Sequence, residues 1–466
     1  MEIFEAAKKQ ETRKESIMKT SIMKRMIGCA MTVILVISLS AGILAQASSP
    51  VVNEEKLLEA TDPILTAYKE HYVLQNVRVT NPSEAFEENG SLYVTFFLTF
   101  DATLKYDSAV DLPRVKGIAQ ALNIDGTLQS VQEFSQELHA ADVMKVISTD
   151  VQSELQTNQA IKAFEAAEAK EAADSTSEKK EPVLSNKEKV SLVSDYVLDE
   201  VDTFVTNLQD EYIGTSSEFN IELRATIDEQ GNVLKLEYGL FSEYSDDITT
   251  VIPASNESMI QAGEKQVSET VNMALEKVAQ NASFSAITPA SNTNFIYYRT
   301  KARDYANTYT SSPDRHYCST HEDYICQDST KYNKWYFYFC CKDCANYVSQ
   351  AMYAGGVPKD NIWIPNKSCA AWNSCKQLRY HFTKKTNYWT KTTYNNCNAG
   401  GVILLIDSSG NPSHAMMNVL NDSVTTKYSA HTNDRDEKVY THSGLLKDSG
   451  ASGIEYYIFD RVSPAH

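Results

Sequence analysis

Hydrophobic residues between residues 54 and 290 follow two kinds of pattern, which together predict a mixture of helices and strands. Apolar positions at helical spacing predict helices at about 54–75, 130–170, 190–212 and 259–278. Runs rich in β-branched and aromatic residues predict strands at 91–104, 219–227 and 233–241. The last two strands are expected to form a hairpin through the turn at 229–232. This region is therefore expected to be α+β, and no group of residues in it resembles a catalytic site.

The pattern is interrupted at 166–189. No large apolar side chain occurs between Phe164 and Val183, where alanine, glutamate, lysine and serine dominate. Such a composition cannot bury a core and predicts a linker, with a solvated helix face as the alternative. The linker divides the region into an N-terminal accessory segment at 48–165 and a second accessory segment at 190–290.

A basic and then apolar segment opens the chain. Lys19, Lys24 and Arg25 precede an apolar run at 26–44, which is followed by Ala-Gln-Ala at 45–47. This order is typical of a secretory signal peptide, here 1–47, with cleavage after residue 47. A membrane anchor is the alternative, because a run of 19 residues can span a bilayer. The mature protein is expected to be secreted or associated with the cell wall, with no integral membrane span.

Length and charge narrow the classes of protein. A chain of 466 residues is too long for one core, so two or three domains are expected. The formal net charge of −18 argues against a nucleic-acid partner and against adhesion to anionic surfaces through bulk charge.

Cysteines gather in the C-terminal part of the chain. Eight of the nine lie between Cys318 and Cys397. In an exported protein this density favours disulfides. A zinc site is the alternative to disulfides. However, the Cys-x-x-Cys pair at 341 and 344 is not followed by a second pair of this kind. Neither a metal nor a cofactor is therefore predicted.

The strongest local signal for chemistry is Asp-Cys-Ala-Asn-Tyr-Val-Ser-Gln at 343–350. The apolar residues that follow Cys344 fall at helical spacing, and Gly355-Gly356 predicts the end of the helix. Cys344 is therefore expected in the first helical turn. There the free backbone N–H groups and the helix dipole favour the thiolate, the form that acts as a nucleophile. Taken alone, the same residue could equally be a disulfide or core cysteine.

A base for this thiol is expected on a later strand. The apolar runs at 400–406 and 413–419 flank a turn and predict two adjacent antiparallel strands. His414 opens the second strand and is the candidate general base. A third polar group must orient the imidazole; His431 is the first candidate, Asn433 the second, and Asp434 is assigned to a turn.

The segment from about 292 to 462 resembles the putative amidase domain family, a branch of the papain-like cell-wall cysteine peptidase superfamily that includes the CHAP amidases. The resemblance rests on Tyr298-Arg299-x-x-Ala302-x-x-Tyr305-Ala306, the motif at 343–350, Trp372, Leu378-x-Tyr380, Ser413-His414-Ala415 and 429–435. It implies a papain-like α+β domain at 292–466, in which the nucleophile helix packs on an antiparallel sheet. It further implies a tyrosine hydroxyl before the cysteine as oxyanion donor, for which Tyr336 and Tyr338 are candidates.

Two features depart from the pattern of related domains. Gly400-Gly401-Val402 stands where they usually have Gly-Asp-Val, which removes a carboxylate but no presumed catalytic group. Cys340 and Cys341 adjoin the motif, and a bridge from either to Cys344 would inactivate the protein when oxidised.

These observations favour a secreted cysteine-nucleophile amidase or peptidase that hydrolyses amide bonds in a cell-wall, peptidoglycan-type peptide. The substrate follows from the resemblance and the signal peptide, not from any single residue. Two alternatives remain open: a non-catalytic cell-wall-binding module with an inherited fold, and a thiol-dependent acyl or peptidyl transferase.

Overall fold

The computed structural model describes most of the chain after residue 52. The described residues are 53–124, 127–170, 185–239, 244–245, 248–280, 295–310, 316–318, 321–326, 331–339, 342–386, 388–432 and 434–459. The predicted signal peptide and the middle of the predicted linker lie outside these residues. Residues 51–466 form one compact unit.

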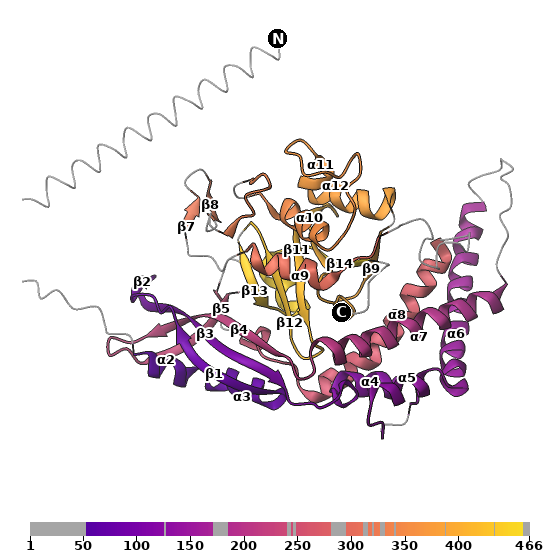
Figure 1. Cartoon of the computed structure of the whole chain (residues 1–466), viewed down its shortest axis with the longest axis horizontal. Helices are drawn as coiled ribbons and strands as arrows, with labels where there is room; N and C mark the ends of the chain where they lie inside the picture. The colour runs from indigo at the N-terminus through magenta and orange to yellow at the C-terminus, as the bar shows by residue number, and fades with distance from the viewer. Residues whose placement is uncertain are drawn as a thin grey trace, which may run out of the picture. The chain divides into compact units, whose positions relative to one another are not determined.

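A six-stranded antiparallel sheet lies in the accessory part of the chain (Figure 1). Its order is β1-β3-β4-β5-β6, with β2 paired to β3. The strands are β1 Tyr72–Thr80, β2 Phe86–Glu88, β3 Ser91–Leu104, β4 Ser216–Ile227, β5 Val233–Gly239 and β6 Tyr244–Ser245. The strand expected at 91–104 and the hairpin of β4 and β5 are confirmed.

Helices precede, separate and follow these strands in the sequence. They are α2 Glu54–Ala60, α3 Asp62–His71, η1 Ala109–Asp111, α4 Pro113–Ala121, α5 Val131–Leu138, α6 Ala141–Lys170, α7 Asn186–Glu211, η2 Ile248–Thr250 and α8 Asn256–Gln280. The helix expected at 54–75 is wrong in extent, because Tyr72 to Gln75 pair with Leu104 to Asp101 as a strand. Part of the predicted linker is helical, since α6 reaches Lys170 and α7 begins at Asn186 under a Ser185 capping box.

The C-terminal part contains a second antiparallel sheet, in the order β13-β12-β11-β10-β14-β9. Its strands are β9 Trp389–Thr392, β10 Val402–Ile406, β11 Pro412–Asn421, β12 Thr426–Ala430, β13 Arg435–Val439 and β14 Gly453–Phe459. The helical segments are α9 Arg299–Thr308, α10 Cys344–Ala354, α11 Ala370–Asn373, α12 Cys375–Tyr380, the π-helical turn η5 His381–Lys385 and α13 His442–Ser449. A short hairpin joins β7 His316–Cys318 to β8 His321–Cys326. The predicted pairing of β10 with β11 is confirmed.

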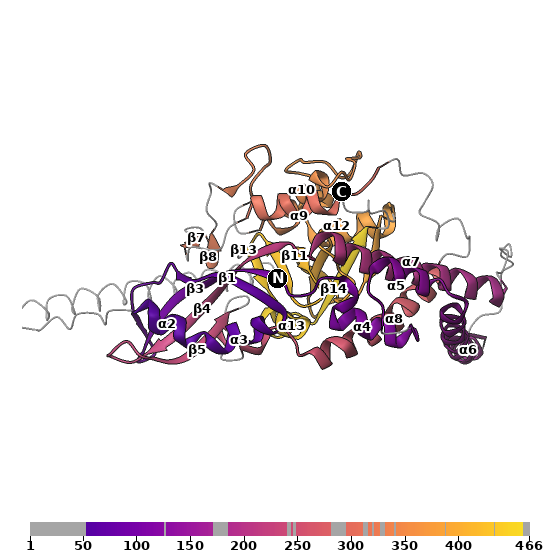
Figure 2. The ribbon, with the colours of Figure 1, turned by 60° about the horizontal axis from the view of Figure 1, so that its bottom comes forward.

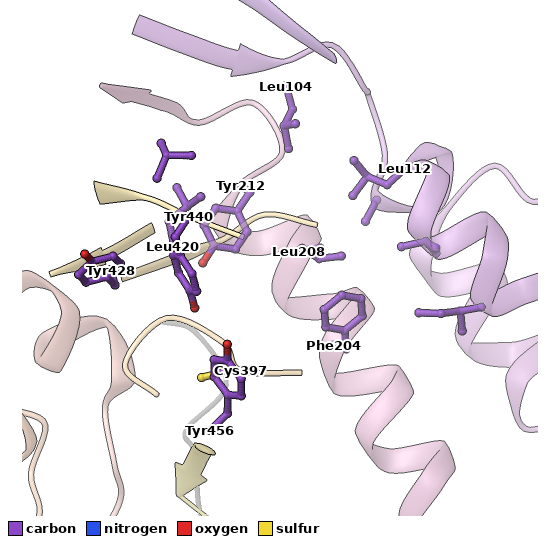
Figure 3. Close-up of a cluster of buried hydrophobic side chains, with 14 of the residues drawn as sticks. Leu104, Leu112, Phe204, Leu208, Tyr212, Cys397, Leu420, Tyr428, Tyr440 and Tyr456 are labelled. Atoms are coloured by element: carbon purple, nitrogen blue, oxygen red, sulfur yellow. The ribbon is translucent and has the colours of Figure 1, made fainter. Parts of the chain in front are cut away.

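This sheet separates two hydrophobic cores, because neighbouring residues of a strand point to opposite faces. On β10, Val402 and Leu404 join the core around α10, whereas Ile403 and Leu405 join the core of the accessory part. Figure 3 shows the core of the accessory part, in which Phe204 and Leu208 of α7 share one cluster with Leu420 and Tyr456 of the C-terminal sheet. The accessory helices and strands thus cover the face of the sheet that α10 leaves free, as the two views of the ribbon agree (Figure 1 and Figure 2).

The packing of helices on antiparallel sheets confirms the α+β class. Within the described ranges, none of the helices combines the length and the apolar character that crossing a bilayer requires.

Candidate active site

Cys344 is the first residue of α10, as the sequence predicted, and the helix ends at Ala354, with Gly355 as its C-cap. The whole stretch from Cys344 to Met352 is buried. The first N–H groups of a helix have no partner within it, so the Cys344 sulfur lies at an end that favours negative charge. Cys344 itself is buried, with 9% of its surface exposed.

The polar residues of the motif fasten α10 to its surroundings. Asn346 accepts a hydrogen bond of 2.7 Å from the indole N–H of Trp372. Ser349 donates to the main-chain carbonyl of Trp372 at 2.9 Å and accepts from the indole of Trp363 at 3.2 Å. Gln350 accepts from the hydroxyl of Tyr305 at 2.7 Å. These bonds fix the rotation of the helix and therefore the direction of the first turn.

His414 lies on β11, opposite Leu405 of β10, and is 8% exposed. The side chain of His414 and the main-chain N–H of Ala415 are among the groups that lower the pKa of Cys344, so both lie beside its sulfur. The structure thus brings together the two residues that the sequence selected as nucleophile and base. A strand supplies the imidazole and a helix supplies the thiol, so each is held by a regular element.

Cys375, the first residue of α12, is a third member of the site. Its Sγ lies 3.5 Å from Sγ of Cys344. The hydrogen bond from Cys375 lowers the pKa of Cys344 well below the usual value; burial opposes this shift, and the charge of His414 adds to it. The same contact raises the pKa of Cys375. Either sulfur could donate in this contact, and the two opposite shifts favour Cys344 as the thiolate of the pair.

His431 contacts the residue that precedes the nucleophile. Its Nδ1 lies 2.7 Å from Oδ2 of Asp343, and its Nε2 lies 2.5 Å from the main-chain oxygen of Tyr309. Asp343 occupies the N-cap position, as predicted, but its side chain does not cap the helix. Both ring nitrogens of His431 are thus engaged with acceptors. Its role as the group that orients His414 stays a prediction, while the observed contact is with Asp343.

The other candidates occupy different surroundings. Asn433 lies outside the described residues, as do Cys340 and Cys341. Tyr336 is stacked on Trp372, with ring centroids 6.0 Å apart. Tyr338 is 40% exposed and packs on Tyr332. Their roles as oxyanion donors stay predictions.

Packing explains the glycine at position 401. A Cβ placed there would lie 2.6 Å from Sγ of Cys397 and 2.9 Å from the main-chain oxygen of Asn398. Contacts this short are not tolerated without movement of the backbone. The aspartate that related domains carry would therefore clash with Cys397 if it stood at position 401.

No group of three or more acidic, histidine or cysteine side chains could hold a metal ion among the residues that the structure describes. The chemistry that this arrangement supports is nucleophilic: a thiol whose pKa is lowered, a nitrogen base beside it, and a helix N-terminus at the same place. Sequence reasoning missed Cys375, since its spacing from Cys344 does not distinguish it from Cys369 or Cys397.

In a comparison with protein families, residues 296–457 match a family described as "Putative amidase domain". The chain thus carries a C-terminal domain of this family, which confirms the resemblance seen in the sequence. The match supports a hydrolase that acts on amide bonds. Neither the curated proteins nor the solved structures contained a match to the chain.

Proposed function

We propose that this protein is a cysteine amidase or peptidase in which Cys344 is the nucleophile and His414 the general base and acid. The observation that carries the proposal is the position of Cys344 as the first residue of α10, with His414 close enough to its sulfur to help lower its pKa. An activated nucleophile and its base within hydrogen-bond reach are what covalent amide hydrolysis requires. The family of the C-terminal domain supports the same reaction class.

In the proposed reaction, the Cys344 thiolate attacks the carbonyl carbon of an amide while His414 holds the proton of the thiol. His414 then donates this proton to the departing amine, which leaves an acyl group on the sulfur. Water activated by His414 attacks this thioester and releases the acid and free Cys344. Main-chain N–H groups in the first turn of α10 are suitable donors for the negatively charged oxygen of the intermediate.

We further propose that the substrate is a cell-wall, peptidoglycan-type peptide and that the protein acts outside the cell. Support for the location comes from the signal-peptide pattern at 1–47. Support for the substrate comes from the amidase family of the domain together with export. Hydrolysis and acyl transfer would both begin with attack on the same carbonyl group. They differ only in whether water or an amine accepts the acyl group.

The proposal is tested with the purified protein and peptidoglycan-type peptides, with products identified by mass spectrometry. Cys344→Ala is expected to abolish cleavage. Loss of the base in His414→Ala is expected to lower kcat about 10²–10⁴-fold. Cleavage that survives in Cys344→Ala would overturn the assignment.

Matched controls separate these effects from loss of structure. Cys369→Ser removes a half-buried thiol, and His139→Ala removes an exposed imidazole in the accessory part; both are expected to leave cleavage unchanged. A second reaction with added amine separates hydrolysis from transfer, because a transferase would form a new amide product.

A further inference from the structure

We propose that Cys344 and Cys375 form a reversible redox pair, in which oxidation of the nucleophile closes a disulfide between α10 and α12. The consequence for activity rests on the proposed function, whereas formation of the disulfide does not. The two cysteines are the first residues of their helices, and their sulfur atoms lie 3.5 Å apart.

The geometry requires only a small movement. A disulfide has an S–S distance of about 2.05 Å, so the two sulfurs must approach by roughly 1.5 Å. Each side chain is at the start of its helix, where rotation about χ1 moves the sulfur without breaking the helix. Both cysteines are buried, with Cys344 9% and Cys375 7% exposed, so the approach of the two sulfurs takes place inside the core.

The electrostatics assign a role to each sulfur. The low pKa of Cys344, caused first by the hydrogen bond from Cys375 and then by His414, makes it the thiolate that an oxidant attacks first. The pKa of Cys375 is raised by its contact with Cys344, and its sulfur lies 3.5 Å from that of Cys344. A reactive thiolate with a resolving cysteine next to it is the arrangement of redox-sensitive sites.

The oxidant that we consider is a peroxide. The Cys344 thiolate attacks one oxygen of hydrogen peroxide; an S–O bond forms, the O–O bond breaks, and hydroxide leaves. The Cys375 sulfur then attacks the sulfenic acid sulfur; the S–S bond forms, the S–O bond breaks, and water leaves with the proton of Cys375. The proton held by His414 neutralises the hydroxide. Two thiols thus lose two electrons and two protons, and the peroxide becomes two waters.

The remaining cysteines with described side chains are not placed to compete. Cys369 donates to the main-chain oxygen of Ile362 at 3.1 Å. Cys397 lies in the core of the accessory part, and burial raises its pKa, which disfavours the reactive thiolate. Closure of the Cys344–Cys375 bond removes the nucleophile, stops amide cleavage and protects Cys344 from irreversible oxidation. A thiol reductant restores it.

The test uses the full-length reduced protein treated with hydrogen peroxide. Peptide mapping without reduction is expected to find the peptide pair linked through Cys344 and Cys375, with amide cleavage lost and then regained on addition of dithiothreitol. In Cys375→Ala, the same treatment is expected to give sulfinic acid at Cys344 and no recovery relative to that variant's own starting activity. Cys369→Ser is expected to behave as the wild type.

The outcomes separate the two proposals. Sulfinic acid at Cys344 in the wild type, or a bridge from Cys344 to another cysteine, overturns the redox pair while leaving the amidase proposal intact. A reversible Cys344–Cys375 bridge in a protein that cleaves no amide when reduced supports the redox pair and overturns the proposed function.

Discussion

The carboxylate of Asp343 accepts a hydrogen bond of 2.7 Å from Nδ1 of His431, so the residue directly before the nucleophile is tied to the turn after β12. Both side chains are buried. Burial lowers the pKa of His431, but the hydrogen bond to Asp343 raises it, and the net shift is upward. When His431 is protonated, it forms a buried ion pair with Asp343 at the N-terminus of α10.

This pair predicts a pH dependence of stability. Because the pKa of His431 is raised, its contribution is fully present below its unfolded pKa of about 6.5 and is lost as the pH rises through the folded value. Burial raises the pKa of Asp434 to about 8, so the folded state keeps a proton that the unfolded state loses above pH ~4. Both groups make the free energy of unfolding smaller at pH 8.5 than at pH 6, as urea titrations at the two pH values can measure.

Two variants separate the contributions to this pH dependence. Asp434→Asn is expected to flatten the loss of stability up to about pH 8. His431→Gln is expected to remove the part that depends on the imidazolium. A wild-type stability that stays constant between pH 6 and 8.5 would contradict the charge states assigned to both residues.

The thiol of Cys375 is expected to activate Cys344 in the reduced enzyme. In Cys375→Ala the thiolate loses a donor, and a hydrogen bond to a charged group contributes about 1.5–3 kcal/mol. The rate of alkylation of Cys344 by iodoacetamide at pH 6 should therefore fall by about tenfold or more. Mass spectrometry of the labelled peptide measures this rate, with Cys369→Ser as control. An unchanged rate would show that His414 alone accounts for the activation.

Position 401 should not accept the aspartate of related domains. Gly401→Asp forces a side chain against Cys397 and Asn398, and overpacking of this kind typically costs about 1–3 kcal/mol. The expected result is a lower Tm with no gain in amide cleavage. Gly453→Ala is the matched control, because a Cβ there meets only Ile406 at 3.9 Å. Equal Tm values for the two variants would refute the packing explanation.

The accessory part should be needed for the stability of the C-terminal domain. Arg299 of α9 forms an ion pair with Glu211 of α7, and both side chains are 5% exposed. Removing one partner of a buried pair leaves a charge without compensation and costs about 3–5 kcal/mol. Glu211→Gln is therefore expected to lower the free energy of unfolding, measured with urea. The double variant Arg299→Met/Glu211→Gln should recover part of the loss; no recovery would show that the pair is not the cause.

A second contact joins the same two parts of the chain. Tyr72 of β1 donates to the buried carboxylate of Asp422 at 2.7 Å. Contacts of this kind, together with the core shared across the C-terminal sheet, mean that the sheet buries one face only when the accessory part is present. We therefore expect this part of the chain to be an integral half of the folded unit.

The sequence by itself determined the elements that carry the chemistry. Helical spacing and Gly355 placed Cys344 at the start of a helix, and two apolar runs around a turn placed His414 on a strand of the adjacent hairpin. These signals are local, because helix caps, turns and side-chain periodicity act over a few residues. The same reasoning predicted β3 correctly. It extended the first helix into β1, because pairing with a distant strand overrides the local preference there.

Only the tertiary structure decided which distant residues meet. Cys375 is 31 residues from Cys344 in the chain, and His431 is 88 residues from Asp343. Nothing in either spacing marks these pairs, since their contact depends on how α12 and the turn after β12 pack around α10. The division of the C-terminal sheet between two cores has the same origin. Alternation along a strand shows that it has two faces, but the partner of each face is chosen by packing over the whole chain.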